Sequence, residues 1–362
     1  MWPLQELGSP PCGAISPKPR CGARPGQSPH IVRRFLPSRI RSPVRLVQPQ
    51  SNRARGRGGV AGKSPLPSLG TESAMPIQWS VSKVDDKVHR LTYTIDSVGK
   101  DVPELLVLTD LHWDSAQCDL ALLKAHMDLA LSRKIPVLIG GDLFDVMQGR
   151  WDPRASQDSL REEHRGGRYF DSVISTALDW FKPYKDILAV VAPGNHETSI
   201  AKRHDTNLIS RFVEGLTRMG ATTLEAGYWG FVQIQVAQKN SHKGQILLHW
   251  THGSGGGAEV TRGFIDQNRV RSMYSADIYV SGHIHRKNYD ENIMLGVSSL
   301  GKLRKQKQLF LRCSTYKDEI DGWHAEKGRA ARPLGGWILQ FNCRRVSKHD
   351  GSIEITPQAI AP

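Results

Sequence analysis

Short apolar runs alternate with helical patterns between residues 105 and 216. The runs at 105–109, 136–140 and 187–192 are rich in Val, Ile and Leu and are bounded by Pro, Gly or Asp, as buried strands are. The segments between and after these runs place apolar residues three and four positions apart, which is the spacing of one helix face. This alternation predicts an α/β fold with parallel strands and right-handed crossovers.

Each of the three predicted helices has an apolar face that would pack against the sheet. In chain order, these faces consist of Leu120, Leu123, Met127 and Leu131, then Val173, Ile174, Ala177, Leu178 and Phe181, then Leu208, Ile209, Phe212, Val213 and Leu216. The run at 187–192 leads into Pro193 to Glu197, which we expect to form a polar turn.

The second half of the chain has a different pattern. Residues 230–238 alternate between apolar and polar positions, and residues 244–252 and 277–283 are also predicted to be strands. Residues 335–343 and 351–358 are typical of a late hairpin. We therefore expect a second, more antiparallel sheet that faces the first, and we find no internal repeat.

The basic character of the chain comes mainly from its first 74 residues. The full sequence has 49 Lys and Arg against 35 Asp and Glu, a net charge of +14. Residues 1–74 hold 12 of these basic residues, 2 of the acidic ones and 12 of the 21 prolines, so +10 lies there and +4 on residues 75–362. A segment of this composition buries too little apolar surface to offset its ordering entropy. We expect residues 1–74 to be disordered and residues 75–362 to form one domain.

Three interpretations of the basic leader compete. It could be a nucleic-acid-binding tail, or a transit peptide, since it is rich in Arg and poor in acidic residues. Pro37 and Pro43 interrupt its helix-like stretch, which argues against a transit peptide. The third interpretation, which we favour, is that translation begins at Met75 and that the leader is not part of the working protein.

The cysteines and the hydropathy bear on location. The 5 cysteines are an odd number and include no CxxC pair, so neither a disulfide framework nor a zinc–thiolate site is indicated. This use of cysteine is typical of a reducing compartment, and we expect a cytoplasmic protein. No run approaches the roughly 20 apolar residues that a membrane helix needs, so no membrane partner is expected.

Polar side chains of metal-ligand type follow five of the predicted strands. A single Asp or His after a strand is usually a turn or cap residue, but five such strand ends together indicate a site. The candidate ligands are Asp110, His112, Asp142, Asn195, His252, His283 and His285. This mixture of nitrogen and oxygen donors without thiolates suits Mn²⁺, Fe or Zn²⁺ better than Ca²⁺.

Seven ligands are too many for one catalytic metal, which keeps an open position. They suit two metals about 3.5–4 Å apart that share a bridging carboxylate. Glycines stand beside these residues at Gly141, Gly194, Gly253 and Gly282, where we expect the backbone to run too close to the cluster for a Cβ.

The order of motifs D-x-H, G-D, G-N-H-E, H-G and G-H-x-H across residues 105–285 resembles the calcineurin-like metallophosphoesterases. Residues 314–337, STYKDEIDGWHAEKGRAARPLGGW, are similar to the corresponding part of phage and prophage members. The resemblance implies a four-layer α/β/β/α sandwich with two facing mixed sheets. It also implies two divalent metal ions, Mn²⁺ first, with Fe, Zn²⁺ or Mg²⁺ as alternatives.

The resemblance assigns the ligands to two metals. One would be held by Asp110, His112, Asp142 and His285, and the other by Asp142, Asn195, His252 and His283, with Asp142 as the bridge. His249 is a rival for the ligand in the fourth motif, because HWTH offers two imidazoles. We favour His252, because a small residue, Gly253, follows it.

The resemblance also implies a reaction. A metal-bound hydroxide would attack phosphorus in line, and both metals would offset the charge that grows on the phosphate oxygens. His196 would protonate the leaving oxygen, since an imidazole exchanges protons near neutral pH, and Asp145 would orient it.

The sequence departs from the protein Ser/Thr phosphatases of this superfamily, whose second motif G-D-x-x-D-R-G supplies an Arg for phosphate. Val146 stands where that Arg would be, so we expect other residues to hold the substrate. The Arg-rich segment 148–170 is near the motifs, although any one Arg there is more simply part of a solvated loop. Our candidate substrate contacts are Arg150, Arg168 and His204.

Taken together, these features predict a two-metal hydrolase of phosphodiester or phosphomonoester bonds, acting on DNA or a nucleotide. The alternatives are a phosphoprotein phosphatase and a catalytically silent nucleic-acid-binding accessory protein. A silent protein would be expected to have a broken ligand set, and this set is intact. The sequence leaves the oligomeric state open.

Overall fold

The computed structural model describes residues 77–148, 160–239, 243–256, 258, 260–321, 323–326, 328–347 and 351–362. The basic leader 1–74 and Arg150 therefore lie outside the described residues.

One sheet contains the parallel strands that the sequence predicts. Its order is β13-β12-β3-β4-β5-β6, with β3, β4, β5 and β6 parallel to one another and β12 antiparallel to both β3 and β13. The strands span Glu104–Leu108 (β3), Val137–Gly140 (β4), Leu188–Ala192 (β5), Leu224–Glu225 (β6), Trp337–Arg345 (β12) and Ile353–Ile360 (β13). The alternating strand–helix order is confirmed.

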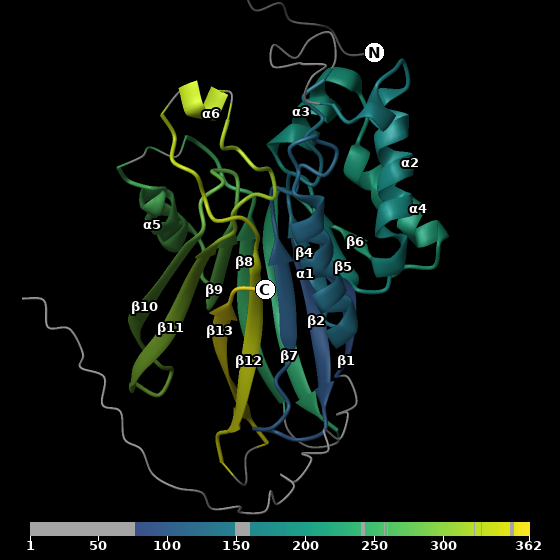
Figure 1. Ribbon diagram of the computed structural model, residues 1–362. Helices are drawn as coiled ribbons and strands as arrows, with labels where there is room; N and C mark the ends of the chain where they lie inside the picture. Colours follow the sequence, from purple (N-terminus) through teal and green to yellow (C-terminus); the bar gives the residue numbers. More distant parts are fainter. Residues whose placement is uncertain are drawn as a thin grey trace, which may run out of the picture. The chain divides into compact units, whose positions relative to one another are not determined.

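Helices cover the outer face of this six-stranded sheet (Figure 1). They are α1 (Leu120–Arg133), α2 (Tyr169–Phe181), α3 (Asn195–His204) and α4 (Leu208–Arg218), with short 3₁₀ turns at Glu162–His164 and Lys182–Tyr184. All five residues of the predicted α4 face are buried. The predicted α1 face is partly wrong, because Leu131 is 37% exposed while His126 is buried. The buried face of α1 is rotated by one position from the predicted face, because the His126 ring packs edge-on against the Tyr316 ring, with centroids 5.6 Å apart.

The second sheet has the order β1-β2-β7-β8-β9-β11-β10 and contains both parallel and antiparallel pairs. Its strands span Gln78–Asp85 (β1), Val88–Ile95 (β2), Trp229–Gln238 (β7), Lys243–Thr251 (β8), Ile278–Ser281 (β9), Asn288–Val297 (β10) and Leu303–Arg312 (β11). Strands β1, β2, β6, β10 and β11 were not predicted. Much of β10 is exposed, so its sequence lacks the apolar run of a buried strand.

The late hairpin and the segment after β5 differ from the predictions. The late hairpin forms, but it joins the first sheet through β12 and β3 rather than the second sheet. Residues Asn195 to Glu197 are not a free turn; they form the first turn of α3, whose Glu197 carboxylate accepts a hydrogen bond from the Gly194 backbone N–H.

The two sheets face each other across a shared apolar core. Inward side chains of both sheets, among them Leu105, Val190, Ile234, Trp250 and Phe341, form one buried cluster. Helix α5 (Phe264–Met273) lies on the outer face of the seven-stranded sheet, where Tyr279 and Phe310 are buried. The described domain is therefore a four-layer α/β/β/α sandwich, with a short helix α6 (Trp323–Glu326) at the same end as α3 in Figure 1.

Of the helices in the described part of the chain, none combines the length and apolar composition that crossing a membrane requires.

Candidate metal centre

The residues predicted as ligands follow five strands that run into the same end of the sandwich. Asp110 and His112 follow β3, Asp142 follows β4, and Asn195 begins α3 directly after β5. His252 follows β8, and His283 and His285 follow β9, in the other sheet. Because β3, β4 and β5 are parallel neighbours and β8 and β9 are parallel neighbours, their C-terminal ends bring all these side chains to one edge.

The backbone of these loops is unusual. Five of the candidate ligands adopt the left-handed region with positive φ, which is uncommon for residues other than glycine. They are Asp110 (φ 54°), His112 (φ 46°), Asp142 (φ 48°), His283 (φ 70°) and His285 (φ 53°). Such conformations persist where surrounding contacts hold them, and here they turn the side chains toward a common point.

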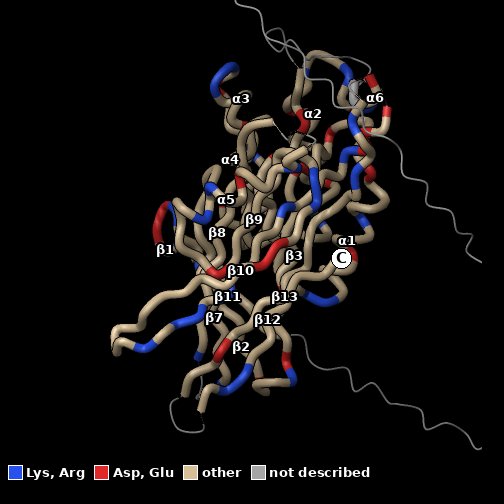
Figure 2. The backbone as a smooth tube through the Cα atoms, turned by 90° about the vertical axis from the view of Figure 1, so that its left-hand side faces the viewer, with Lys and Arg blue, Asp and Glu red and all other residues tan. Residues whose placement is uncertain are grey.

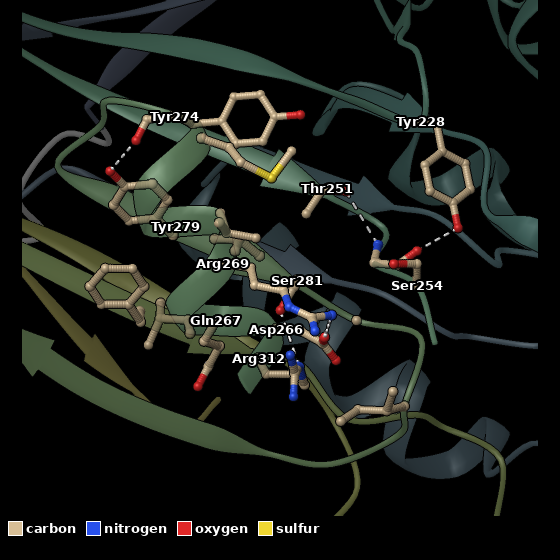
Figure 3. Close-up of a pocket in the computed structure, with 18 residues that line it drawn as sticks. Tyr228, Thr251, Ser254, Asp266, Gln267, Arg269, Tyr274, Tyr279, Ser281 and Arg312 are labelled. Atoms are coloured by element: carbon tan, nitrogen blue, oxygen red, sulfur yellow. Dashed lines mark hydrogen bonds and ion pairs between the residues drawn. The ribbon is translucent and has the colours of Figure 1, made fainter. Parts of the chain in front are cut away.

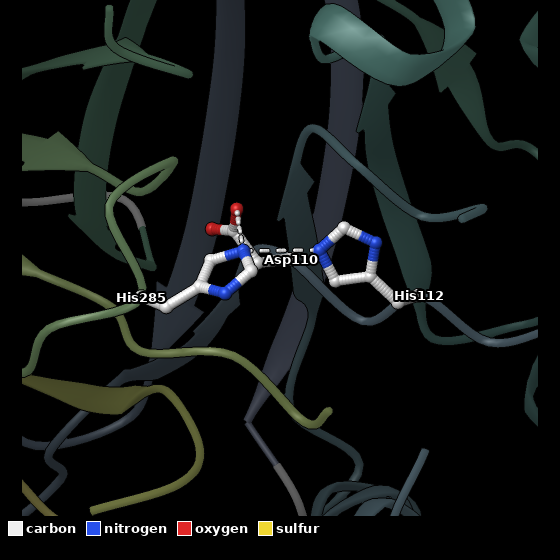
Figure 4. A group of neighbouring side chains, drawn as sticks. All are labelled: Asp110, His112 and His285. Atoms are coloured by element: carbon white, nitrogen blue, oxygen red, sulfur yellow. Dashed lines mark hydrogen bonds and ion pairs between the residues drawn. The ribbon is translucent and has the colours of Figure 1, made fainter. Parts of the chain in front are cut away.

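One group of donors consists of Asp110, His112 and His285 (Figure 4). The Nε2 atoms of His112 and His285 lie 3.1 Å apart, and His285 Nε2 lies 3.4 Å from Asp110 Oδ1. Asp110 and His112 are fully buried. The donor atoms of this group all lie within 4.8 Å of one another, so a single cation could contact all three.

A second group consists of Asp142, His252 and His283. His252 Nε2 lies 3.1 Å from Asp142 Oδ2. Asn195 belongs to the same group, because its Oδ1 lies 3.0 Å from His252 Nε2 and 2.7 Å from His283 Nδ1. These side chains are the ones that the family resemblance assigns to the second metal, an assignment that stays a prediction.

Asp142 lies between the two groups. It belongs to the second group and also forms a third one with His112 and His196, in which the candidate ligand atoms again lie within 4.8 Å. His196 Nε2 is 3.7 Å from Asp142 Oδ2, and its backbone N–H donates to Asp142 Oδ1 at 3.0 Å. This position suits a bridging carboxylate and places the His196 imidazole beside the pair of sites.

Opposite charges stabilise the carboxylates of the centre. Burial by itself would raise the pKa of Asp110, but the charges of His252 and His285 outweigh burial and lower it to about 2. Burial opposes the ionisation of Asp142 too, and His252 and His196 hold its pKa well below the usual range.

The imidazoles of the centre divide into two kinds. Burial lowers the pKa of His112 and of His283. Burial would also lower the pKa of His252, yet Asp142 and Asp110 raise it to about 9. For His285, hydrogen bonds to Asp110 and Glu319 outweigh burial and raise the pKa to about 10. The carboxylates around His252 and His285 therefore make this end of the sandwich favourable for positive charge.

Glycines make room for the carboxylates. A Cβ on Gly194 would lie 2.0 Å from Asp142 Oδ1, and one on Gly282 would lie 2.3 Å from Asp110 Oδ2. As expected from the sequence, the backbone at these two positions passes too close to the cluster for any side chain.

The two imidazoles of the fourth motif have different surroundings. His252 faces Asp142 and Asn195, whereas His249 is stacked on the Tyr274 ring with centroids 4.0 Å apart. His249 lies on the outer face of β8, away from the core between the sheets, and burial lowers its pKa to about 4. The geometry therefore favours His252 as the ligand.

Asp145 orients His196 differently from our expectation. The His196 Nδ1–H donates to the backbone carbonyl oxygen of Asp145, while the Asp145 carboxylate lies 3.9 Å from that nitrogen. The carboxylate instead lies 3.0 Å from His112 Nδ1 and accepts from Lys317 Nζ at 3.1 Å. Asp145 thus positions His196 through its main chain and His112 through its side chain.

Several supporting residues were missed at the sequence level. Glu319 lies 2.9 Å from His285 Nδ1, and the Thr315 hydroxyl donates to the Asp110 carbonyl oxygen at 2.8 Å. Together with Lys317 they belong to the segment 314–337 that is similar to phage members, which was the available signal. Asp114 accepts hydrogen bonds from the backbone N–H groups of Asp145 and Val146, at 2.6 and 3.1 Å, and so holds the loop after β4.

The predicted substrate contacts remain predictions. Arg168 is exposed at the residue before α2, and the His204 imidazole packs on Phe170 with ring centroids 5.3 Å apart. The basic residues at the end of α3 lie at the exposed tip of the helix in Figure 2. Arg150 lies outside the described residues.

The donor set fits a pair of divalent cations. It consists of carboxylate and amide oxygens and imidazole nitrogens, mostly buried. Behind the imidazoles, the Asp145 carboxylate lies 3.0 Å from His112 Nδ1 and the Glu319 carboxylate 2.9 Å from His285 Nδ1. Lone-pair atoms packed this closely repel one another unless protons or cations lie between them.

Several solved structures are similar to this chain. Among solved structures, Vps29 of Chaetomium thermophilum is similar over 71% of this chain and 95% of its own, with 10% identity and a TM-score of 0.28. A predicted phosphoesterase of Streptococcus pneumoniae matches over 71% of this chain and 99% of its own, with 11% identity and a TM-score of 0.28. GAP50 of Plasmodium, described as an anchor in the inner membrane complex, matches over 72% and 89%, with 9% identity and a TM-score of 0.34. These likenesses bear on neither activity nor partners.

A search of curated protein sequences finds no relative of this chain. The model of the calcineurin-like phosphoesterase family, however, matches residues 104–287, half of the chain and all five motif loops. The chain therefore belongs to the calcineurin-like phosphoesterase family.

Proposed function

We propose that this protein is a two-metal-dependent hydrolase of phosphate esters, with a nucleotide or nucleic-acid phosphodiester as its substrate. The observation that carries this proposal is the convergence of the seven donor residues into two groups around Asp142. Asp110, His112, Asp142 and His285 would hold one metal, and Asp142, Asn195, His252 and His283 the other. Mn²⁺ is the first candidate, and Fe, Zn²⁺ or Mg²⁺ are alternatives that the same donors accept.

Bound metals of this kind polarise the phosphoryl oxygens and make water a nucleophile at neutral pH. The residues of the chain then have separate tasks. Asp142 keeps both positions negatively charged, because its pKa lies well below the usual range. Asp145 and Glu319 fix the rings of His112 and His285 through their Nδ1 atoms, which leaves the Nε2 atoms directed into the centre.

His196 is suited to protonate the leaving oxygen. Its Nδ1 must carry a hydrogen, because the partner of that atom is the Asp145 carbonyl oxygen, which can only accept. The proton that the ring exchanges is therefore held at Nε2, the nitrogen that lies 3.7 Å from Asp142. Nε2 thus faces the place where the phosphate would lie between the two donor groups.

The loop after β4 bears on substrate preference. The protein-phosphatase Arg is replaced by Val146, which is 1% exposed, so the side chain at this position packs into the core and cannot grip phosphate. This favours a diester or nucleotide over a phosphoprotein. The cytoplasmic location expected from the cysteine pattern is part of the proposal; Cys118, Cys313 and Cys343 are free thiols, which a reducing compartment maintains.

The test compares hydrolysis of bis(p-nitrophenyl) phosphate and p-nitrophenyl phosphate by the full chain with Mn²⁺. Asp142→Asn and His196→Gln are run beside the wild type. We expect diester turnover that Asp142→Asn abolishes and that His196→Gln lowers about 100-fold or more, the range of a positioned general acid. Full metal binding without turnover of either compound would favour the silent accessory protein, and faster hydrolysis of the monoester would favour a phosphatase.

A further inference from the structure

A cleft separate from the metal centre lies between α5 and the outer face of the seven-stranded sheet (Figure 3). Its volume is about 250 Å³. The sheet side is formed by residues of β8, β9 and β11, and the helix side by residues of α5 from Asp266 to Met273.

The sheet contributes a buried cation. Arg312 is 3% exposed, and its Nε donates to the Ser281 hydroxyl at 3.2 Å. Its Nη1 has no hydrogen-bond partner among the described residues. The charges of Asp266 and Asp110 act on the guanidinium, and Asp266 lies 3.7 Å from Arg269 Nη1 on the same helix. Arg312 therefore lines the cleft and carries a buried donor that no described residue satisfies.

The helix contributes a buried amide. Gln267 is 6% exposed and lines the cleft, and within the described part of the chain neither its Oε1 nor its Nε2 has a hydrogen-bond partner. Burying an unpaired amide costs roughly 1–3 kcal/mol in proteins, and burying an unpaired charge costs more. Two such groups lining one cleft are better explained by a ligand that pairs with them than by loose packing.

The remaining wall is aromatic. Tyr274, Tyr279 and Phe310 line the cleft, and Tyr279 lies parallel to Phe310 with ring centroids 4.5 Å apart. Apolar and aromatic walls with a few convergent polar groups are typical of small-molecule sites. The combination suits a flat ring that carries hydrogen-bond groups on its edge.

The cleft adjoins the metal-ligand loops. Gly253 and Gly282 line one end of it, and they are the chain neighbours of His252 and His283. The Tyr228 hydroxyl, also in the lining, donates to the Gly253 carbonyl oxygen at 2.6 Å. The same backbone segments thus form part of both sites.

We propose that this cleft binds the nucleobase of a nucleotide, with Arg312 and Gln267 reading the edge of the base. An Arg donor matches the O6 and N7 acceptors of guanine, and a Gln amide can both accept from and donate to a base edge. Guanine is therefore the first candidate. The proposal deepens the proposed function, because it gives the substrate a base next to the phosphate site, and it rests on that function for its biological meaning.

The experiment measures base binding without turnover. Full-length Asp142→Asn protein in chelator is titrated calorimetrically with guanosine, adenosine and uridine monophosphates and with inorganic phosphate. We expect guanosine monophosphate to bind most tightly and inorganic phosphate not to compete. Adding Gln267→Leu or Arg312→Met should weaken guanosine monophosphate binding about 10-fold or more, the size of one base-edge contact. Arg304→Met, an exposed Arg on the same strand β11, is the matched control.

The outcomes separate the two proposals. The base site would be overturned if Asp142→Asn bound guanosine monophosphate equally well with and without Gln267→Leu. It would also be overturned if the protein bound inorganic phosphate alone, or no nucleotide at all. Gln267→Leu decides the matter if Arg312→Met does not fold, because replacing an unpaired buried amide with an apolar side chain should preserve the fold. Cleft-dependent nucleotide binding in a protein whose wild type fails the turnover test would overturn the phosphoesterase proposal and leave the base site standing.

Discussion

Lys317 stands 172 residues beyond Asp145 in the chain and donates to its carboxylate. Both side chains are buried, Lys317 at 7% exposure and Asp145 at 4%. Burial opposes the charge on Asp145, but His112 and Lys317 lower the pKa of its carboxyl. The carboxylate in turn fixes Nδ1 of His112, so the ammonium group acts on a candidate metal ligand through one intermediate residue.

Lys317→Met should therefore weaken metal binding. The substitution removes the hydrogen bond from the Lys317 ammonium to the Asp145 carboxylate. That carboxylate is then held less firmly, and so is the His112 ring beside it. Loss of an outer partner of this kind typically lowers metal affinity about 10- to 100-fold. Mn²⁺ titration followed by electron paramagnetic resonance measures the effect, with the exposed Lys305→Met as control. An unchanged Mn²⁺ affinity in Lys317→Met would show that Asp145 needs no cation there.

His249 should make the domain sensitive to acid. Burial lowers its pKa to about 4, whereas the unfolded chain has the ordinary value of 6.5, so the unfolded state binds the proton more tightly. Above pH 6.5 His249 is neutral in both states, and its burial does not lower the free energy of unfolding. As the pH falls from 6.5 to 4, the unfolded chain takes up a proton at His249 that the folded domain does not, and the free energy of unfolding decreases. At about 1.4 kcal/mol per unit, the loss is up to roughly 3 kcal/mol.

His249→Phe keeps the stack on Tyr274 and removes the titration. We expect the melting temperatures of wild type and variant to differ little at pH 7.5 and the variant to be more stable at pH 5. Thermal melts between pH 7.5 and 4.5 measure this, and parallel acid profiles for the two proteins would contradict the assignment.

The segment between β11 and β12 is the element that completes the centre. Strand β11 ends at Arg312 in one sheet and β12 begins at Trp337 in the other, so the chain must cross between the sheets. It crosses at the edge where the ligands lie, and there it delivers Thr315, Lys317 and Glu319. The position of β12 beside β3 therefore determines whether these supporting residues reach the site.

Strand β12 should be essential to the fold. Phe341 is fully buried between the sheets, and its ring lies 5.9 Å from that of Tyr93. Phe341→Ala removes this packing and leaves a cavity, at a cost of about 3–5 kcal/mol. Urea unfolding followed by fluorescence gives the free energy of unfolding. Phe264→Ala, at a site that is 42% exposed, should cost less than about 1 kcal/mol, and similar losses in both variants would argue against this core.

At the scale of the domain, the candidate metal centre lies where the loops of the two sheets meet. Asp110, Asp142 and Asn195 come from the loops of the six-stranded sheet, and His252 and His283 from those of the seven-stranded sheet. Bound cations would therefore link the sheets at one end, while the apolar core holds them together elsewhere.

Metal removal should lower the stability of the whole domain without unfolding it. One site occupied at 100 times its dissociation constant adds about 2.7 kcal/mol, which corresponds to a melting temperature about 5–10 °C higher. Thermal melts in Mn²⁺ and in chelator measure the difference, and Asp142→Asn should show a smaller one. Equal melting temperatures of the wild type in both conditions would contradict metal binding between the sheets.

The local pattern of the sequence determined the parallel strands β3, β4 and β5, the faces of α2 and α4, and the candidate ligands. These features depend on residues close together in the chain, where apolar spacing and a polar residue after a strand carry the information. The local pattern predicted the wrong position where contacts between distant segments decide how an element packs. His126 replaces Leu131 on the buried face of α1 because Tyr316 packs there, and the late hairpin joins the first sheet because β12 pairs with β3.

Tertiary structure alone decided which polar residues act together. The sequence offered His249 and His252 as alternatives, and the two faces of β8 separate them: one ring stacks on Tyr274 and the other meets Asp142. The roles of Lys317 and of the Asp145 carbonyl follow from contacts across more than 50 residues, which no local spacing encodes. The order of residues along the chain places a donor after each of these strands, and the packing of the two sheets decides which of those donors can share a cation.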